Sequence, residues 1–569
     1  MFAIFLVVSM FSQGLTIVSY GNSFITAFPE NLGYYYTHTS RSLRVTALHE
    51  DTSVDIFYNG SSTPTKTISI SQKGNTVTLK FPKSAEVYQL DYATQSIRIS
   101  STKNIVVHSG SNTYDEVNKK SVQTNVVQPD ENLDTHYLIP SLNYTDLLAT
   151  FGISPPDIAS KRYGSFRLII INAEDTENNI TIVKNISGSI QLESFMIPSY
   201  QLIQLHFNAS LMMVNSSSKI AVLLTHPCLE KPGCTCSILV HQILPVRFQG
   251  QNFVVPSFPG ITQRWLLDTS NDKTNSLPQN NTNLMPNLSG LWSISDPDKS
   301  QYVTASSNMS LRLISPGLFI ELIPENMFAA CYLLHFYTYN KQAIVIAKTD
   351  SKDEVHTGET LQNAVWTEIP DTEYSSGTIT LNEESSVIWH PSSKIAVYIL
   401  QNPVETIFGG PAIPINEKPD KSGCVVIPGV FNVGHEPLKW AESLDSCAHD
   451  QKEFACPTDE GLQMDLVSAV DTTDAEGWIG LRRSLMTTEW YWKNQTSPSS
   501  PSPPVTYVNW GDGEPQDTLK GFCASLSLDG TDDFKWKSAK CCEEKFPICY
   551  KPPTTIVPEP QPYQTENIP

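Results

Sequence analysis

The stretch that decides the fold of the C-terminal part of the chain covers residues 478–549. Aromatic residues, a Glu-Pro dipeptide and cysteines follow one another in this order: Trp478-Ile479-Gly480-Leu481, Trp490-Tyr491-Trp492, Val508-Asn509-Trp510-Gly511-Asp512-Gly513-Glu514-Pro515-Gln516-Asp517, Cys523, Trp536, Cys541 and Phe546-Pro547-Ile548-Cys549. Disulfide bridges stabilise small, loop-rich domains by restricting their unfolded chains. We therefore expect a separate disulfide-bonded domain here, in which Trp478 and Trp536 pack in the core.

Residues upstream extend this pattern. Trp440, Leu444 and Cys447 lie at i, i+4 and i+7, so they share one face of a predicted helix. Together with the motifs of residues 478–549, this helix resembles the start of a C-type lectin-like domain, an α+β fold, over residues 424–551. The resemblance makes residues 465–470 the strand that usually follows the first helix. Only residues 471–477 then remain before Trp478, which implies a shortened second helix.

The resemblance implies two disulfide bridges, Cys447–Cys549 and Cys523–Cys541. It leaves Cys424, Cys456 and Cys542 unassigned, and Cys456 has both Cys542 and Cys424 as candidate partners. The chain has 11 cysteines, so at least one is unpaired within the chain.

The Glu-Pro loop carries the candidate binding chemistry. In sugar-binding members of the family, a Glu-Pro-Asn or Gln-Pro-Asp loop and an Asn-Asp pair after a tryptophan hold calcium, which needs six to eight oxygen ligands. The resemblance makes Glu514, Gln516 and Asp517 candidate calcium ligands, with Glu514 and Gln516 also contacting sugar, and it implies a cis Pro515.

The second half of that calcium pattern differs here. Lys537 and Ser538 follow Trp536 where Asn and Asp are expected. This removes a carboxylate and brings an ammonium group toward the site, while three upstream carboxylates are candidate replacements: Asp529, Asp532 and Asp533. The alternative is that the loop keeps its shape without a metal ion.

The pattern of residues 20–406 indicates a mainly β body. Three segments each combine a strand, a Ser-rich turn with Lys and an apolar strand: 97–107, 213–223 and 387–397, with a weaker copy at 311–318. We interpret them as tandem, sandwich-like β units that each end in a hairpin. The alternative is that Ser-Ser-Lys is simply a common turn.

Short motifs in this region resemble the N-terminal domain of IgGFc-binding proteins, which are mucus-associated secreted proteins. The motifs are Gly21-Asn22-Ser23-Phe24-Ile25-Thr26-Ala27-Phe28-Pro29, Ile105-Val106-Val107-His108-Ser109-Gly110, Thr135-His136-Tyr137-Leu138-Ile139-Pro140-Ser141-Leu142, Val240-His241-Gln242-Ile243-Leu244-Pro245 and Phe253-Val254-Val255-Pro256. The resemblance covers roughly residues 20–410. It implies an extracellular β-rich module with immunoglobulin or mucin as partners.

Several features favour a secreted glycoprotein. The apolar run of residues 1–11 is too short to span a membrane and is typical of a signal peptide, predicted at 1–19, although a buried first strand is the alternative. No later run reaches membrane length. Glycosylation sequons begin at Asn59, Asn143, Asn179, Asn185, Asn208, Asn215, Asn280, Asn287, Asn308 and Asn494.

Composition sets the remaining boundaries. Residues 407–422 are rich in Gly and Pro and are predicted as a linker, followed by the lectin-like domain at 423–551 and a Pro-rich tail at 552–569. The formal net charge of −20 opposes binding to nucleic acid or anionic lipid.

No sequence motif indicates catalysis. Cys228, Cys234 and Cys236 are candidate zinc ligands, but a small disulfide loop is favoured in a secretory chain. His108, His226 and His241 adjoin apolar strands and are interpreted as structural. We therefore predict a non-enzymatic, secreted recognition or adhesion protein that binds glycan or glycoprotein through its lectin-like domain, with calcium as the candidate cofactor. Two alternatives are a calcium-independent protein-binding module and a structural mucus or matrix component.

Overall fold

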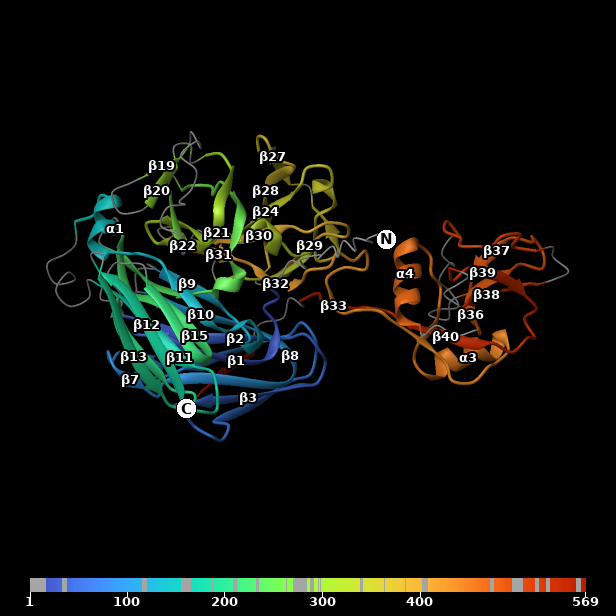
Figure 1. Cartoon of the computed structure of the whole chain (residues 1–569), viewed down its shortest axis with the longest axis horizontal. Coiled ribbons are helices and arrows are strands. Elements are labelled where there is room, and N and C mark those ends of the chain that lie inside the picture. The colour runs from blue at the N-terminus through green and yellow to red at the C-terminus, as the bar shows by residue number, and fades with distance from the viewer. Residues whose placement is uncertain are drawn as a thin grey trace, which may run out of the picture. The chain divides into compact units, whose positions relative to one another are not determined.

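The computed structural model describes residues 17–568, except for these segments: 33–37, 115–119, 155–164, 187–188, 208–211, 232–234, 262–263, 270–283, 287–290, 295, 297, 338–340, 363, 384, 402–407, 471–474, 494–504, 517–520, 529–532 and 559–563. The chain forms two compact units (Figure 1). Unit 1 combines Met1–Cys424 with Ile556–Pro569, and unit 2 is Val425–Thr555.

Unit 1 is built almost entirely from antiparallel sheets. The first two sheets contain β1 (Gly21–Pro29), β2 (His38–Ala47), β3 (Thr52–Tyr58), β4 (Lys66–Ile70), β5 (Thr76–Phe81), β6 (Glu86–Val87), β7 (Tyr92–Ala93), β8 (Ser96–Tyr114), β9 (Lys120–Val127), β10 (Asp134–Ile139), β11 (Phe166–Asn172), β12 (Asn178–Ile186), β13 (Ser189–Ile197), β14 (Leu202–Phe207), β15 (Met212–Lys231), β16 (Thr235–Gln242) and β42 (Gln564–Asn567). Helix α1 (Tyr144–Thr150) covers part of the second sheet's apolar core.

Further sheets complete unit 1. They contain β17 (Gly250–Val255), β18 (Trp265–Thr269), β19 (Leu284–Pro286), β20 (Leu291–Ile294), β21 (Gln301–Ser315), β22 (Leu318–Glu321), β23 (Cys331–His335), β24 (Lys341–Lys348), β25 (His356–Thr357), β26 (Thr360–Leu361), β27 (Val365–Glu368), β28 (Tyr374–Leu381), β29 (Ser385–Trp389), β30 (Ala396–Gln401), β31 (Phe408–Pro411) and β32 (Ile413–Asn416). Their apolar runs are buried on both faces, as in Ala343, Ile344 and Val345 of β24.

The sequence repeats lie on strands that change partners along their length. Residues 97–101 of β8 pair with β3, whereas residues 105–114 pair with β2. In β15, residues 212–216 pair with β12 and residues 220–225 pair with β11. The predicted hairpin is therefore wrong for these two copies. The Ser-rich segment stays within one strand because each half already has its own partners. The third copy is divided into β29 and β30, which pair with different strands. The weaker copy at 311–318 is divided into β21 and β22, which do pair as a hairpin.

Two tyrosines repeat the same contact in different sheets. The Tyr137 hydroxyl accepts from the backbone N–H of Asp134 at 3.1 Å and donates to the carbonyl of Ile220 at 2.6 Å. The Tyr332 hydroxyl accepts from the N–H of Ala329 at 3.0 Å and donates to the carbonyl of Ile395 at 2.9 Å. Each tyrosine thereby ties the start of its strand to the residue that follows a Ser-rich segment.

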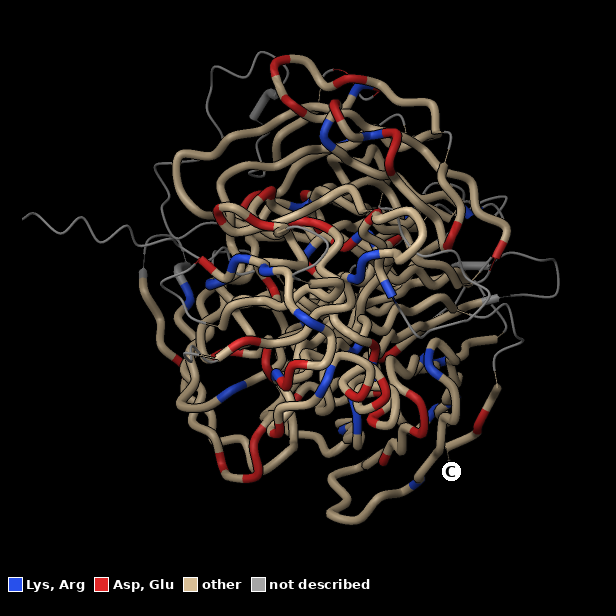
Figure 2. Tube along the Cα trace, turned by 90° about the vertical axis from the view of Figure 1, so that its right-hand side faces the viewer, with Lys and Arg blue, Asp and Glu red and all other residues tan. Residues whose placement is uncertain are grey.

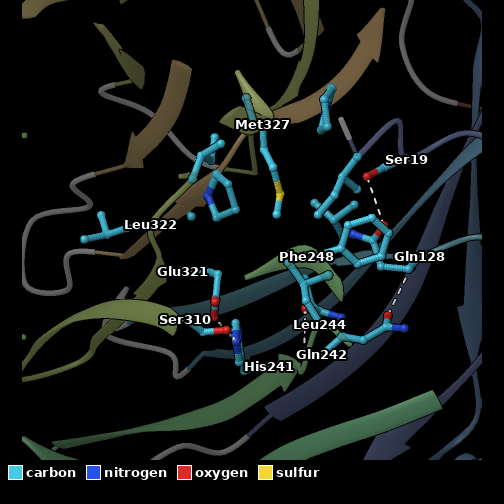
Figure 3. Close-up of a pocket in the computed structure, with 18 of the residues that line it drawn as sticks. Ser19, Gln128, His241, Gln242, Leu244, Phe248, Ser310, Glu321, Leu322 and Met327 are labelled. Carbon is cyan, nitrogen blue, oxygen red and sulfur yellow. Dashed lines mark hydrogen bonds and ion pairs between the residues drawn. The ribbon is translucent and has the colours of Figure 1, made fainter. Parts of the chain in front are cut away.

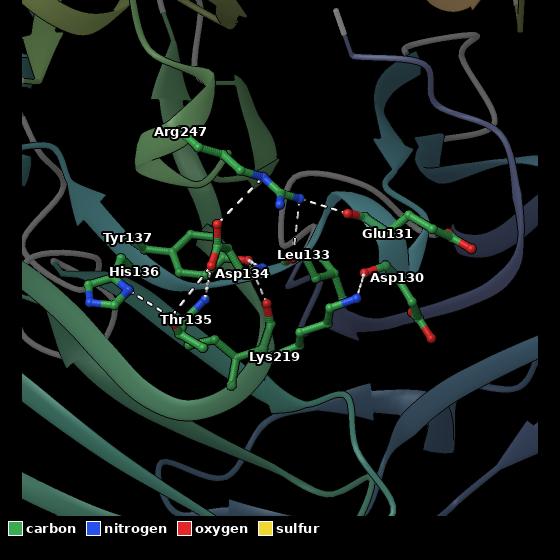
Figure 4. Close-up of polar contacts among 10 residues, drawn as sticks. Asp130, Glu131, Leu133, Asp134, Thr135, His136, Tyr137, Lys219 and Arg247 are labelled. Atoms are coloured by element: carbon green, nitrogen blue, oxygen red, sulfur yellow. Dashed lines mark hydrogen bonds and ion pairs between the residues drawn. The ribbon is translucent and has the colours of Figure 1, made fainter. Parts of the chain in front are cut away.

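A polar junction surrounds the first of these tyrosines (Figure 4). Arg247 donates to the carbonyls of Glu131 at 2.6 Å and Leu133 at 3.3 Å, and its Nε lies 3.5 Å from an Asp134 carboxylate oxygen. Lys219 donates to the carbonyl of Asp130 at 3.0 Å. These long side chains satisfy backbone carbonyls where strands from three parts of unit 1 meet.

Three segment boundaries predicted from the sequence differ from those in the structure. The predicted linker contributes β31 and β32 to the sheets, because Phe408, Ala412 and Ile413 are apolar enough to be buried. Residues 556–568 return to unit 1, where β42 pairs in parallel with β5 and Ile568 enters the core of the first sheet. The predicted signal segment ends in folded structure, since Ile17 and Ser19 are buried.

Unit 2 is an α+β domain. Its elements are β33 (Val425–Ile427), β34 (Val430–Val433), α3 (Trp440–His449), β35 (Glu453–Phe454), α4 (Glu460–Ala469), β36 (Glu476–Arg483), β37 (Trp490–Trp492), β38 (Cys523–Ser527), β39 (Trp536–Ala539), β40 (Phe546–Lys551) and β41 (Thr554–Thr555). Helix α3 forms where the sequence predicts a helix. The strand predicted at 465–470 is wrong, because Asp459 caps α4 by accepting from the N–H of Leu462 at 3.0 Å, and Gln463 and Leu466 share its buried face.

The core of unit 2 is built around tryptophans. Trp440, Trp478, Trp492 and Trp536 are almost completely buried. Trp478 and Trp536 thus pack in the core. No described helix of either unit is long and apolar enough to cross a membrane.

Candidate functional site

The Glu-Pro loop of unit 2 lies beside β39, and its carboxylate is bound by the protein itself. The peptide bond between Glu514 and Pro515 is cis. Glu514 Oε2 accepts from the backbone N–H of Ser538 at 2.9 Å, from the Ser538 hydroxyl at 2.5 Å and from the backbone N–H of Gln516 at 3.1 Å. Glu514 Oε1 accepts from the Gln516 side-chain amide at 2.9 Å. Both oxygens are therefore engaged.

The two residues after Trp536 have different partners. Neighbouring residues of a strand point to opposite faces of the sheet. Ser538 bonds to Glu514, whereas the Lys537 ammonium lies 3.8 Å from a Glu476 carboxylate oxygen. Glu476 is therefore one partner of the Lys537 ammonium. Ser538 takes the position opposite the carboxylate.

These contacts decide the electrostatics of Glu514. Burial opposes ionisation, but the hydrogen bonds from Ser538 and Gln516 outweigh it and lower the pKa of the Glu514 carboxyl. A carboxylate that accepts several hydrogen bonds is stabilised in its charged form without a cation. The loop is thus ionised and satisfied by donors of its own domain.

The residues present do not fit the expected calcium site. A calcium ion bound by Glu514 and Gln516 would have to displace Ser538 and the Gln516 amide from the carboxylate. Within the described ranges, no group of three or more His, Cys, Asp or Glu is placed to hold a metal ion. Asp517, Asp529 and Asp532 lie outside the described residues, and Asp533 is in the turn before β39.

Packed aromatic side chains hold the Glu-Pro loop in place. Trp536 donates from its ring N–H to Gln463 of α4 at 3.0 Å, and its backbone carbonyl accepts from the N–H of Gly511 at 2.9 Å. Trp510 lies between Trp490 and Trp536, with ring centroids 4.8 and 5.8 Å away. The aromatic residues quoted at the outset therefore position the Glu-Pro loop as well as filling the core.

A hollow of about 420 Å³ lies over the turn between β36 and β37. Trp490, Tyr491 and the aliphatic side chain of Leu485 line it, together with Arg482 and Arg483. Leu485 and the adjacent Met486 are 74% and 96% exposed. Arg483 donates to the carbonyl of Thr488 at 2.8 Å and to that of Gln516 at 3.4 Å, which joins this turn to the Glu-Pro loop. This surface was not predicted from the sequence, although consecutive Leu and Met residues in a turn could have indicated it.

Unit 1 contains a second hollow, a cavity of about 100 Å³ (Figure 3). Its apolar wall includes Leu244, Phe248 and Met327, and its polar wall includes His241 and Glu321, whose Nε2 and Oε2 atoms lie 2.8 Å apart. Glu321 also bonds to the fully buried Arg312 at 2.7 Å, so the charges of this wall are balanced.

The N-terminal segment closes one side of this cavity. Ile17 packs with Phe248 and Met327, and the Ser19 hydroxyl donates to Gln128 at 3.1 Å. Burial lowers the pKa of His241 although the neighbouring Glu321 opposes the shift. The predicted structural role of His241 agrees with this pairing, and His108 likewise contacts the hydroxyl of Tyr337 at 3.2 Å.

The cysteines form bridges within each unit. The structure contains Cys447–Cys549 and Cys523–Cys541, the two pairs that the resemblance implies, together with Cys228–Cys236 and Cys331–Cys424. Cys424 is therefore not the partner of Cys456. Cys456 and Cys542 are unpaired among the described residues, and Cys234 lies outside them.

The sequon asparagines differ in their surroundings. Asn59, Asn179 and Asn308 are exposed, and Asn143 caps α1 by accepting from the N–H of Thr145 at 2.9 Å. Asn215 is half-buried in β15, and Asn185 lies in β12. The remaining sequon asparagines lie outside the described residues: Asn208, Asn280, Asn287 and Asn494.

Comparisons with known proteins match both units. Residues 123–400 match the family model described as IgGFc binding protein, and residues 436–551 match the model of the lectin C-type domain. C-type mannose receptor 2 of Rattus norvegicus is 31% identical over 111 residues, which is 20% of this chain and 7% of the relative. Lithostathine-1-alpha of Homo sapiens is 34% identical over 86 residues, 15% of this chain and 46% of the relative.

The matched parts thus cover less than half of either relative. Among solved structures, human lithostathine is 22% identical, covering 21% of this chain and 88% of that chain with a TM-score of 0.19. Both matched families are non-enzymatic binding domains.

Proposed function

We propose that this chain, which carries an IgGFc-binding protein domain followed by a C-type lectin domain, is a secreted recognition protein. In this proposal the lectin-type domain binds a protein ligand without calcium. The observation that carries it is the Glu514 carboxylate, whose oxygens accept hydrogen bonds from Ser538 and Gln516.

The surface beside that loop supports a protein ligand. Leu485 and Met486 are adjacent and highly exposed, and Arg483 and Tyr491 line the neighbouring hollow. Protein interfaces are enriched in Met, Tyr and Arg around an apolar centre. We assign ligand contact to this turn, which we call the Leu485 turn (residues 482–491).

Calcium-dependent sugar binding is the second candidate. Glu514 and Gln516 keep part of the expected loop, and this favours it. The two candidates differ in two measurable ways: whether chelation removes binding, and whether Glu514 or the Leu485 turn carries it.

The proposed function is tested with the full-length chain on a glycan array and on an array of purified extracellular proteins, each with calcium and with chelator. Leu485→Ser/Met486→Ser is the test variant, and Glu514→Ala is the matched comparison. The proposal expects protein spots that persist in chelator, weaken at least tenfold in the Leu485 turn variant and survive in Glu514→Ala. Glycan spots that require calcium and vanish in Glu514→Ala would establish the second candidate instead.

Unit 1 supplies a further, separate contact in this proposal. Its family match supports immunoglobulin as a partner of unit 1, and the sequence resemblance adds a mucin. The recurrence of partner-changing strands and of the Tyr137 and Tyr332 contacts supports tandem β units as its plan. Acidic and basic residues are interspersed along the trace (Figure 2). Binding of purified Fc or mucin to full-length chain tests this partner directly, and the absence of binding to both would remove it.

A further inference from the structure

Strand β13 exposes an apolar face at the edge of a sheet. It is the terminal strand in the order β13-β12-β15-β11-β14-β7. Ile190, Leu192 and Met196 are 69%, 67% and 47% exposed. Their position numbers differ by two and four, so they share one face of the strand. An exposed apolar edge strand is a template for pairing with another chain.

A glycosylation sequon faces the same side. In the register of β12 and β13, Asn179 is opposite Met196 and Val183 is opposite Leu192. Directly opposite residues in an antiparallel pair lie on the same face of the sheet. Asn179 is exposed and begins the sequon Asn179-Ile180-Thr181. The acceptor side chain and the apolar face of β13 therefore lie side by side.

The spacing suits a covering role. Asn179 and Val183 are four residues apart on β12, which corresponds to roughly 13 Å along the strand. An N-linked glycan is a bulky, solubilising group, so one attached at Asn179 reaches Leu192 as well as Met196.

We propose that Asn179 carries an N-linked glycan that covers the apolar face of β13 and prevents a second copy of this chain from pairing there. The proposal shares with the proposed function only the premise that the chain is secreted. It makes no use of the Glu514 loop or the Leu485 turn. Failure of ligand binding and failure of this proposal are therefore distinguishable.

The test uses full-length chain secreted from a glycosylating host. Peptide mass spectrometry measures occupancy at Asn179, sedimentation velocity measures association, and a hydrophobic dye measures the exposed apolar surface. Asn179→Gln removes the acceptor. Thr181→Ser keeps the sequon in place, and Asn59→Gln removes an exposed sequon in the turn after β3. Asn179→Gln combined with Ile190→Thr and Leu192→Thr removes both the glycan and the apolar face.

The expected result is high occupancy at Asn179 and, for Asn179→Gln alone, at least a threefold rise in dye fluorescence with concentration-dependent dimers or larger species. The Thr181→Ser and Asn59→Gln variants behave like the unchanged protein, and the combined variant returns to it. An unmodified Asn179 overturns the proposal, as does an Asn179→Gln protein that matches Asn59→Gln. Loss of secretion that the Thr substitutions do not restore also overturns it, because Asn179 would then serve folding itself.

Discussion

Ser538 donates both its backbone N–H and its hydroxyl to Glu514 Oε2, at 2.9 and 2.5 Å. In the calcium-binding pattern that the family resemblance implies, the corresponding position supplies a further carboxylate to a shared cation. Here a donor faces the carboxylate instead of a second acceptor. Hydrogen-bond donors of Ser538 therefore stabilise the charge of the Glu514 carboxylate without a metal ion.

The hydroxyl of Ser538 is expected to stabilise unit 2. Ser538→Ala removes one hydrogen bond to a charged group, and because this group is partly exposed we expect a loss of about 1 kcal/mol in unfolding free energy. Chemical denaturation followed by tryptophan fluorescence measures the loss. Ser468→Ala, on the exposed face of α4, is the matched control and should change stability by less than about 0.5 kcal/mol. Equal stability of the two variants would show that the hydroxyl contributes nothing.

The disulfide Cys331–Cys424 is expected to stabilise unit 1 strongly. It joins residues separated by 93 positions, and loops of this length are expected to contribute about 4–5 kcal/mol through the unfolded chain. Cys424→Ser should lower the unfolding free energy of unit 1 accordingly. Cys542→Ser removes an exposed thiol that is unpaired within the described ranges and should leave the denaturation midpoint unchanged. Similar midpoints for the two variants would contradict the assigned pairing.

Unit 1 is expected to lose stability as the pH falls below 6.5. Burial, and secondarily the nearby Arg44, lowers the pKa of His108 from 6.5 to about 3. The unfolded chain therefore binds a proton below pH 6.5 that the folded chain does not, and the folded state is penalised down to about pH 3. For one such histidine the penalty between pH 6.5 and 5 is roughly 1.5 kcal/mol.

The variant His108→Gln should remove that share of the pH dependence. Denaturation curves at pH 6.5 and 5 measure it, and His449→Gln, an exposed residue of α3, is the control. An unchanged pH dependence in His108→Gln would show that His108 is not a source of the penalty.

The segment 17–19 is expected to belong to the mature protein. Ile17 packs on Phe248 and Met327, and Ser19 bonds to Gln128 and to the carbonyl of Pro414. A chain made to begin at Tyr20 should lose about 2 kcal/mol relative to one that begins at Leu15, mainly through the buried Ile17. N-terminal sequencing of secreted protein should find a start at or before Ile17. A natural start at Tyr20 would contradict this expectation.

Local patterns predicted much of this structure. The i, i+4, i+7 spacing of Trp440, Leu444 and Cys447 predicts α3, because one helix face is enough to define a helix. Many strands of unit 1 were predictable from the alternation of polar and apolar residues and from apolar runs, because each such segment indicates a strand by itself. The Glu-Pro loop with its cis bond follows from a local motif.

Features set by distant partners were not predictable. The family resemblance implies a strand at 465–470, but the Asp459 cap and the contact of Gln463 with Trp536 make residues 465–469 part of α4. The Ser-rich repeats suggest turns, yet occupied pairing edges keep β8 and β15 continuous. The return of β42 to β5 depends on a strand roughly 480 residues away, which no local pattern records.

The candidate site was likewise predictable only in part. Glu514 is recognisable from its motif, and the absence of Asn-Asp after Trp536 indicates a weakened calcium site. The direction of Ser538 toward Glu514 and of Lys537 toward Glu476 depends on the pairing of β38 with β39. Only the structure shows that the substituted residue satisfies the carboxylate.

The most direct measurement is calorimetric titration of calcium into the full-length chain, with Lys537→Asn/Ser538→Asp as the variant that restores the expected Asn-Asp pair. The account predicts no saturable binding by the unchanged protein up to about 10 mM calcium, well above the dissociation constants of weak extracellular sites, and new calcium binding in the variant. Saturable one-site binding by the unchanged protein that disappears in Glu514→Gln would contradict it.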